Sequence, residues 1–301
     1  ICAALAAMAQ VRVATPNIEL ILNAEPGQEL QIAYFGGRLA DGDLANLQAA
    51  GAPNHNAYPP YGFNCPSEAS LAVTHMDGNM STVLKVESVA QADEPSAKVT
   101  RIRLKDTVYP FYVTVCYRAY QDVDMIETWT EIENLEKKPV TLTRFDSGYL
   151  PIRVGDVWVS HLYGTWANEG RLAQEPLERG MMTIKNKDGV RNAHTDHAEV
   201  MFSLDGKPQE NTGRVIGAAL CYSGNYELRI DTRDTDYHQF FAGINPDNSS
   251  YSLASKEVFK TPELALTYSE EGLSGASRNF HRWARNYKIA HGNKPRKILL
   301  N

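Results

Sequence analysis

Residues 126–133 read Ile-Glu-Thr-Trp-Thr-Glu-Ile-Glu and decide the class of fold. In this stretch Ile126, Thr128, Thr130 and Ile132 alternate with Glu127, Trp129, Glu131 and Glu133. A period of two residues places successive side chains on opposite faces of an extended chain. The stretch therefore predicts an antiparallel strand with two different faces.

Similar runs of β-branched and aromatic residues continue on both sides, from Val11 to about Thr267. Five further strands are predicted at residues 112–117, 140–143, 157–160, 200–204 and 264–268. Turn-forming residues separate them at 205–206, 223–225 and 245–248, and one short helix is predicted at Asp43–Ala50. Because no helices alternate with the strands, the sequence predicts a mostly β, large antiparallel sandwich of roughly 250 residues in one domain.

The strongest helical signal is Ser274–Ile289, SGASRNFHRWARNYKI. Its apolar residues recur at helical spacing and form one stripe, at Phe280, Trp283, Ala284 and Tyr287. Either Ser274 or Ser277 is predicted to cap the N-terminus of this helix. Gly292 and Pro295 are predicted to end the helical segment.

Both ends of the chain look cut. Ile1–Ala9, ICAALAAMA, is apolar and ends in the Ala-x-Ala pattern of a secretory cleavage site, so we interpret it as a signal-peptide remnant. This interpretation predicts export to the periplasm or secretion. The alternative is that the segment forms a buried strand or a short helix. The segment is too short to span a membrane. Lys297–Asn301, KILLN, reads as the start of a buried strand. We therefore expect a remnant at 1–9, a sandwich at 10–273, and a linker helix at 274–301 that led into a further domain.

The composition is that of an ordinary globular protein of 301 residues. A hydrophobic content of 43% excludes disorder, and a net charge of −6 gives no basic field for nucleic acid or a membrane surface. Four cysteines, Cys2, Cys65, Cys116 and Cys221, are too few for a disulfide scaffold and include no Cys-x-x-Cys pair for zinc. Export would permit Cys116 and Cys221 to pair, and the sequence leaves that question open.

No motif identifies a catalytic centre. The chain contains no G-x-S-x-G elbow, P-loop or G-x-G-x-x-G sequence, and nothing in the sequence supplies a base to activate Cys65. The densest ligand-like cluster is His194-Thr195-Asp196-His197 with Glu199. On a strand the two imidazoles would point to opposite faces, so we predict loop histidines and no metal. We also predict no cofactor.

Two loops combine aromatic faces with short polar groups, as carbohydrate sites do. The first includes Tyr58, Tyr61, Asn64 and Glu68 and continues to residues 75–79, and the second is Tyr163–Arg171 with Trp166. The alternative is that turn-forming Gly and Asn residues lie beside aromatic residues of the core.

Several segments together resemble a known family. They are LAVTHMDGN at 71–79, LYGTW at 162–166, QENTG at 209–213, GINP at 243–246, ASRNFHRWAR at 276–285 and KPRKILLN at 294–301. These segments resemble bacterial, Bacteroides-like α-galactosidases of glycoside hydrolase family 36. The resemblance covers nearly the whole chain after residue 9.

The resemblance implies an N-terminal β-supersandwich, joined by a linker helix to a (β/α)₈ barrel that these residues lack. In that family two aspartates of the barrel hydrolyse terminal α-galactosides, of the melibiose and raffinose type, with retention and without a metal. The sandwich supports the barrel and assembly into a homo-oligomer, and one sandwich loop closes the substrate pocket of a neighbouring subunit. The implied partners are therefore the chain's own barrel, α-galactoside oligosaccharides and further copies of the protein.

The pocket-closing loop carries Gly-Asp-Phe in many bacterial members, and Gly62-Phe63-Asn64-Cys65 is the matching stretch here. Asn64 would replace the carboxylate, which keeps a hydrogen bond but loses the strength of a charge-assisted one. This departure bears on the contact with the neighbour and on the preferred oligosaccharide length. The candidate substrate-binding residues are Tyr61, Asn64, Cys65 and Trp166, and no catalytic residue is expected in this chain.

Two other functions stay open. A stand-alone, lectin-like sandwich would hold galactosides in the two aromatic loops. A parent enzyme that cleaves α-N-acetylgalactosaminides would share the architecture, and only the pocket of the barrel would tell it from an α-galactosidase.

Overall fold

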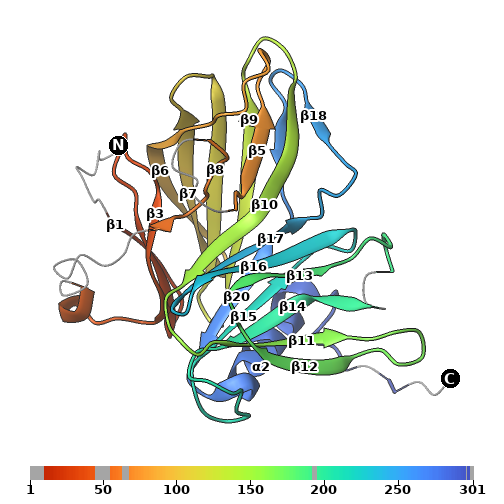
Figure 1. The fold of residues 1–301 in the computed structure, drawn as a ribbon. Coiled ribbons are helices and arrows are strands. Elements are labelled where there is room, and N and C mark those ends of the chain that lie inside the picture. Colours follow the sequence, from red (N-terminus) through yellow and green to blue (C-terminus); the bar gives the residue numbers. More distant parts are fainter. Residues whose placement is uncertain (1–9, 45–54, 63–67, 192–194, 296, 299–301) are drawn as a thin grey trace.

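In the described part of the chain the strands form three antiparallel sheets (Figure 1). The computed structural model describes residues 10–44, 55–62, 68–191, 195–295 and 297–298. The first sheet has four strands in the order β1-β2-β3-β4. These strands are β1 (Gln10–Ala14), β2 (Ile18–Asn23), β3 (Gln31–Gly37) and β4 (His55–Asn56).

The largest sheet has ten strands in the order β12-β11-β14-β15-β20-β9-β8-β7-β6, with β19 added beside β9. Its first half consists of β12 (Arg171–Pro176), β11 (Trp158–Tyr163), β14 (Asp196–Ser203), β15 (Val215–Leu220) and β20 (Leu264–Ser269). Its second half consists of β9 (Ile126–Asn134), β8 (Phe111–Tyr120), β7 (Ala97–Asp106), β6 (Leu84–Glu94) and β19 (Val258–Lys260).

The third sheet has six strands in the order β13-β16-β17-β10-β18, with β5 also paired to β10. The strands are β13 (Gly180–Lys185), β16 (Tyr226–Asp234), β17 (Tyr237–Ile244), β10 (Val140–Ile152), β18 (Tyr251–Leu253) and β5 (Leu71–Thr74). The long β10 shifts register at Asp146/Gly148 against β17. This irregularity lies at the point where the buried Asp146 contacts Arg229 of β16.

A continuous hydrophobic core joins the three sheets. Leu22, Phe240 and Phe202 come from the first, third and largest sheets respectively, and all three are fully buried. The rings of Phe202 and Phe240 meet edge to face, with centroids 5.2 Å apart. The predicted fold, a mostly β antiparallel sandwich, is confirmed.

The strand predicted at 126–133 is β9, and both of its faces are covered. Ile126 and Ile132 enter the core. On the opposite face, Glu127 is fully buried, and Trp129 lies between the guanidinium of Arg118 (5.0 Å) and the ammonium of Lys260 (4.9 Å). Long cationic side chains therefore cover the more polar face of β9, which carries Glu127 and Trp129.

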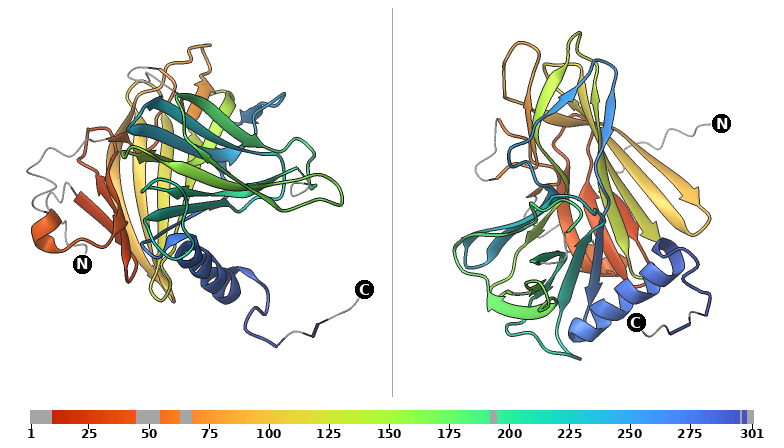
Figure 2. Two further views of the ribbon diagram at one scale, coloured as in Figure 1. Left: turned by 60° about the horizontal axis from the view of Figure 1, so that its bottom comes forward. Right: turned by 90° about the vertical axis from the view of Figure 1, so that its right-hand side faces the viewer.

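Helix α2 (Gly272–Trp283) lies across β20 and β15 of the largest sheet and continues as a π-helical turn, η1 (Ala284–Lys288) (Figure 2). The predicted apolar stripe faces the sheet: Trp283 is buried, and Phe280, Ala284 and Tyr287 pack beside it. The indole N–H of Trp283 donates to Glu127 Oε1 (2.9 Å). The helix is therefore fixed to the sheet by both apolar and polar contacts.

The predicted serine cap is wrong, because the helix begins before Ser274 and no side chain caps it. Instead the N–H groups of Gly272, Leu273 and Ser274 donate to the carbonyls of Gly213, Gln209 and Glu210, at 3.0, 3.1 and 2.9 Å. Gly272 has φ +63°, and a Cβ there would lie 2.6 Å from the Gln209 carbonyl oxygen. A distant loop therefore supplies the acceptors that a local cap would otherwise provide.

Other predicted segments fall partly outside the described residues. Residues 41–44 are helical, but most of the helix predicted at Asp43–Ala50 and the whole of residues 1–9 lie outside. Of the strand start predicted at 297–301, Lys297 and Ile298 belong to no strand and are exposed, and residues 299–301 lie outside.

Candidate functional site

Tyr61 is held by backbone segments on two sides. Its N–H donates to the Leu71 carbonyl (2.7 Å), and its carbonyl accepts the Thr82 N–H (3.1 Å). The Ser70 N–H also donates to the Pro59 carbonyl (2.7 Å), so residues 59–61 run beside the start of β5. Tyr61 is nevertheless 51% exposed. A fixed backbone thus presents an aromatic ring to the surroundings.

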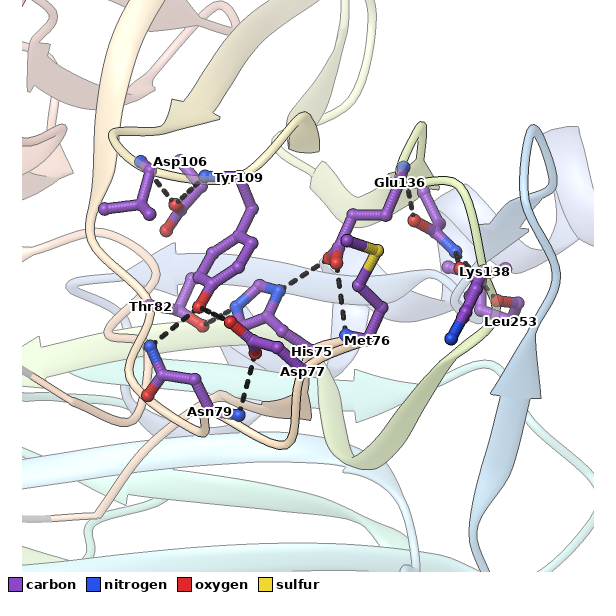
Figure 3. Close-up of polar contacts among 12 residues, drawn as sticks. His75, Met76, Asp77, Asn79, Thr82, Asp106, Tyr109, Glu136, Lys138 and Leu253 are labelled. Atoms are coloured by element: carbon purple, nitrogen blue, oxygen red, sulfur yellow. Dashed lines mark hydrogen bonds and ion pairs between the residues drawn. The ribbon is translucent and has the colours of Figure 1, made fainter.

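His75 follows β5 directly and is buried (Figure 3). Its Nδ1 lies 2.7 Å from Glu136 Oε1, and its Nε2 lies 3.0 Å from the hydroxyl of Thr82. Glu136 and Thr82 are buried as well. Glu136 also accepts the Met76 N–H (3.1 Å) at its second oxygen. The imidazole thus joins the β9–β10 turn to the segment that holds Tyr61.

Tyr109 covers the imidazole of His75. The two rings are stacked, with centroids 3.8 Å apart and planes 10° apart. The Tyr109 hydroxyl donates to Asp77 (2.9 Å) and accepts from Asn79 Nδ2 (2.9 Å) (Figure 3). Hydrogen bonds from the Asn79 N–H and then from Tyr109 lower the pKa of Asp77. Polar side chains at the surface therefore hold the ring that covers the buried imidazole.

A second buried cluster centres on Arg229 of β16. Its guanidinium contacts the carboxylates of Glu68 and Asp146, each at 2.5 Å, and it lies 4.7 Å from the centre of the Phe241 ring. Arg229 and Asp146 are almost fully buried. Burial raises the pKa of Asp146 to about 6, although the charge of Arg229 opposes the rise. Glu68 is thereby tied to the six-stranded sheet.

Trp166 lies in the turn between β11 and β12, and it is 82% exposed. The turn is held by its own hydrogen bonds: Asn168 N–H to the Thr165 carbonyl (2.9 Å), and Ala167 N–H to the carboxylate of Glu169 (2.9 Å). Ala167 has φ +60°, an unusual conformation for a residue with a Cβ. The exposed indole is thus carried on an ordered turn.

The structure separates the predicted substrate-binding residues. β5, which pairs with the Tyr61 segment, lies in the upper part of Figure 1, and the β11–β12 hairpin that carries Trp166 projects at its lower right. Asn64 and Cys65 lie outside the described residues. Tyr58, from the first predicted sugar loop, is a core residue whose hydroxyl donates to the Asp146 carbonyl (3.0 Å).

The remaining candidates from the sequence are the cluster at residues 194–199 and the cysteines. His197 lies 3.3 Å from Glu199 at the surface, and His194 is outside the described residues. Within the described part of the chain, no group of three or more His, Cys, Asp or Glu side chains could hold a metal ion. Cys116 and Cys221 are free thiols. No helix in the described ranges is long and apolar enough to cross a membrane.

Comparison with known proteins decides the family. Residues 28–254 match the model of the glycosyl hydrolase family 36 N-terminal domain. The chain belongs to this family. The bifunctional alpha-galactosidase/sucrose kinase AgaSK of Mediterraneibacter gnavus is 29% identical over 70% of this chain, and alpha-galactosidase AgaA of Geobacillus stearothermophilus is 29% identical over 69%. The matched parts are only 22% and 28% of those relatives, so the match spans about a quarter of their length.

Solved structures share the fold of this family 36 domain. A variant of the same Geobacillus enzyme in complex with stachyose superposes with a TM-score of 0.87 at 23% identity, over 96% of this chain and 45% of that one. The alpha-galactosidase from Lactobacillus brevis gives 0.83 at 20% identity, over 92% of this chain and 41% of that one.

Several segments that carry the family resemblance lie where different elements of the fold contact one another. Residues 71–79 form β5 and the His75 turn, and residues 209–213 accept the first hydrogen bonds of α2. At Gly243 a Cβ would lie 2.7 Å from the Cα of Asp146, so close packing there requires glycine. Sequence reasoning missed Glu136, Asp146 and Arg229, since each resembles any other charged residue of a strand or turn.

Proposed function

We propose that this chain is the N-terminal, non-catalytic portion of a retaining α-galactosidase that hydrolyses terminal α-galactosides of the melibiose and raffinose type. The family match over residues 28–254 carries the proposal. The catalytic aspartates would lie in a (β/α)₈ barrel that follows helix α2 in the complete protein. The sandwich would support that barrel and the assembly of a homo-oligomer.

The surface around α2 supports the docking of a following domain. An apolar groove of about 510 Å³ runs between α2 and strands β12, β11, β14 and β15, lined in part by Leu172, Leu273 and Phe280. Ile298, beyond the helix, is fully exposed. Covering these side chains would remove apolar surface from water, which favours association.

We further propose that the segment beginning at Tyr61 closes the substrate pocket of a neighbouring subunit, with Asn64 and Cys65 in the loop that contacts sugar. The support is the combination of a fixed backbone and a half-exposed ring at Tyr61. Aromatic rings stack on the C–H faces of pyranosides, and this contact needs a rigid platform.

Expression of two forms tests the enzyme proposal. The complete open reading frame that contains these residues should hydrolyse p-nitrophenyl α-galactoside, melibiose and raffinose, whereas the 301-residue chain should not. Activity in the 301-residue chain would refute the non-catalytic role. Faster hydrolysis of the α-N-acetylgalactosaminide by the complete protein would instead identify the alternative substrate.

Trp166 supports a second candidate function, a stand-alone domain that binds galactosides. An indole that is 82% exposed on an ordered turn could stack on a sugar ring. Calorimetry of the 301-residue chain with galactose, melibiose and raffinose at millimolar concentration should then give heat, and W166A should abolish it. The absence of heat in the unaltered chain would reject this candidate.

We propose export to the periplasm or secretion, supported by the Ala-x-Ala pattern at residues 7–9. Fractionation of the native cells should find the protein outside the cytoplasm. Its recovery in the cytoplasmic fraction alone would reject export.

A further inference from the structure

We propose that the buried His75–Glu136 pair and Thr82 form a positioning unit for Tyr61. The inference rests on the proposed function, in which Tyr61 contacts sugar. It names the residues that hold this ring in place, and none of them touches substrate.

Tyr61 depends on Thr82 for its position on one side. The Thr82 N–H donates to the Tyr61 carbonyl, and the next residue, Gly62, has φ +136°. A Cβ at Gly62 would lie 2.8 Å from the Thr82 nitrogen, so the two backbones are in tight contact. A movement of Thr82 therefore moves the backbone that carries the Tyr61 ring.

Thr82 is in turn held by His75. It lies in the connection that precedes β6, outside the hydrogen-bonded ladder of the sheet. The Val83 N–H is bound by Asp106 (2.7 Å), while the Thr82 hydroxyl lies 3.0 Å from His75 Nε2. The Thr82 side chain is buried, so it cannot exchange this partner for water without opening the structure.

His75 is fixed from three directions. Glu136 lies 2.7 Å from Nδ1, Tyr109 stacks on one face, and the edge of Phe111 meets the ring at a centroid distance of 5.5 Å. Glu136 is itself anchored, because its N–H donates to Asn134 Oδ1 (2.9 Å). Whichever tautomer His75 adopts, Nε2 keeps the Thr82 hydroxyl as its partner.

An apolar cluster would fill the same space without three buried polar groups, which cost free energy unless they are paired. A hydrogen-bonded chain has a specific geometry that apolar packing lacks. The path Glu136–His75–Thr82–Tyr61 therefore suits the positioning of a surface ring. Figure 3 shows its first part, from Glu136 through His75 to Thr82.

Amide hydrogen exchange on the 301-residue chain tests the path directly. T82V replaces the hydroxyl by a methyl group of equal size, and we expect the Tyr61 and Thr82 amides to exchange about tenfold faster, as for the loss of one buried hydrogen bond. T82S keeps the hydroxyl and should restore slow exchange. T183V, which alters an exposed threonine on β13, should leave both amides unchanged.

Equal protection of the Tyr61 amide in T82V and the unaltered chain would overturn the inference. So would a uniform loss of protection that includes β16 and β17, because that would be global destabilisation. H75F should reproduce the local effect of T82V, since it removes the partner of the hydroxyl and keeps an aromatic ring.

Kinetics of the complete protein separate the inference from the proposed function. We expect T82V to raise KM for raffinose about fivefold with little change in kcat, T82S to restore KM, and Y61A to raise KM at least as much. If Y61A leaves KM unchanged, the sugar contact of Tyr61 in the proposed function is wrong and the inference falls with it. If Y61A raises KM and T82V does not, only the positioning unit is wrong.

Discussion

Replacement of Arg229 by methionine should destabilise the chain, and more so at alkaline pH. R229M removes the guanidinium between Glu68 and Asp146 but keeps an unbranched side chain over Phe241. It leaves the fully buried carboxyl of Asp146 without its charged partner. Breaking a buried ion pair in this way costs about 3–5 kcal/mol.

The pH dependence arises from Asp146, whose pKa is already raised to about 6 with Arg229 present. A carboxyl with a raised pKa binds its proton more tightly in the folded state, so its contribution to stability is lost as the pH rises. Without Arg229 the pKa rises further, and the loss continues beyond pH 6. Two additional pH units, from 6 to 8, correspond to about 3 kcal/mol. We therefore expect R229M to lose about 3–5 kcal/mol at pH 8 but only about 1–2 kcal/mol at pH 5.

Urea unfolding at pH 5 and pH 8, followed by the fluorescence of buried Trp129 and Trp283, measures both values. In the double variant D146N/R229M the side chain at position 146 cannot ionise, so most of the difference between the two pH values should disappear. R278M breaks the exposed pair with Glu271 and should cost less than about 1 kcal/mol. An equal loss at both pH values, or a loss below 1 kcal/mol at pH 8, would refute the reasoning.

Three further changes probe α2 and the exposed indole. G217A would place a Cβ 2.6 Å from the Phe280 ring and should lower stability by about 1–3 kcal/mol. G42A has open space around it and lies in a helical turn, so it should not lower stability, and thermal unfolding compares the two variants. E127Q weakens four polar contacts of Glu127, including those from Trp283 of α2 and Lys288 of η1. It should lower the free energy of unfolding by about 1–3 kcal/mol and speed proteolysis after residue 283. An unchanged rate of cleavage would contradict this prediction. W166A should leave stability within about 0.5 kcal/mol, and a larger fall in Tm would mean that the indole packs against the chain.

Local sequence patterns predicted the strands and the helix well but their tertiary contacts poorly. The period of two at 126–133 identified β9, and the stripe at 280–287 identified the helix. Neither pattern could show that the helix buries Glu127, because that contact joins residues 156 positions apart. The helix cap failed for the same reason: its acceptors come from residues 209–213.

The candidate site was predictable only in part. The two tyrosines at residues 58–62 indicated a candidate sugar loop, and of these Tyr61 is exposed whereas Tyr58 is buried. The groups that hold it are distant in sequence: Glu136 is 61 residues from His75, and Arg229 is 161 from Glu68. A single sequence contains no signal for such pairs, since any buried charge can find its partner on another strand.

The placement of the family segments also bears on function. A stand-alone sugar-binding domain would be expected to concentrate them in exposed aromatic loops. Here residues 71–79 form the support of Tyr61, residues 209–213 begin helix α2, and Gly243 allows β17 to approach Asp146. Only the segment 162–166 ends at an exposed aromatic residue, Trp166. Segments devoted to holding a helix and a loop in place favour a domain that positions other parts of an enzyme over one that binds sugar alone.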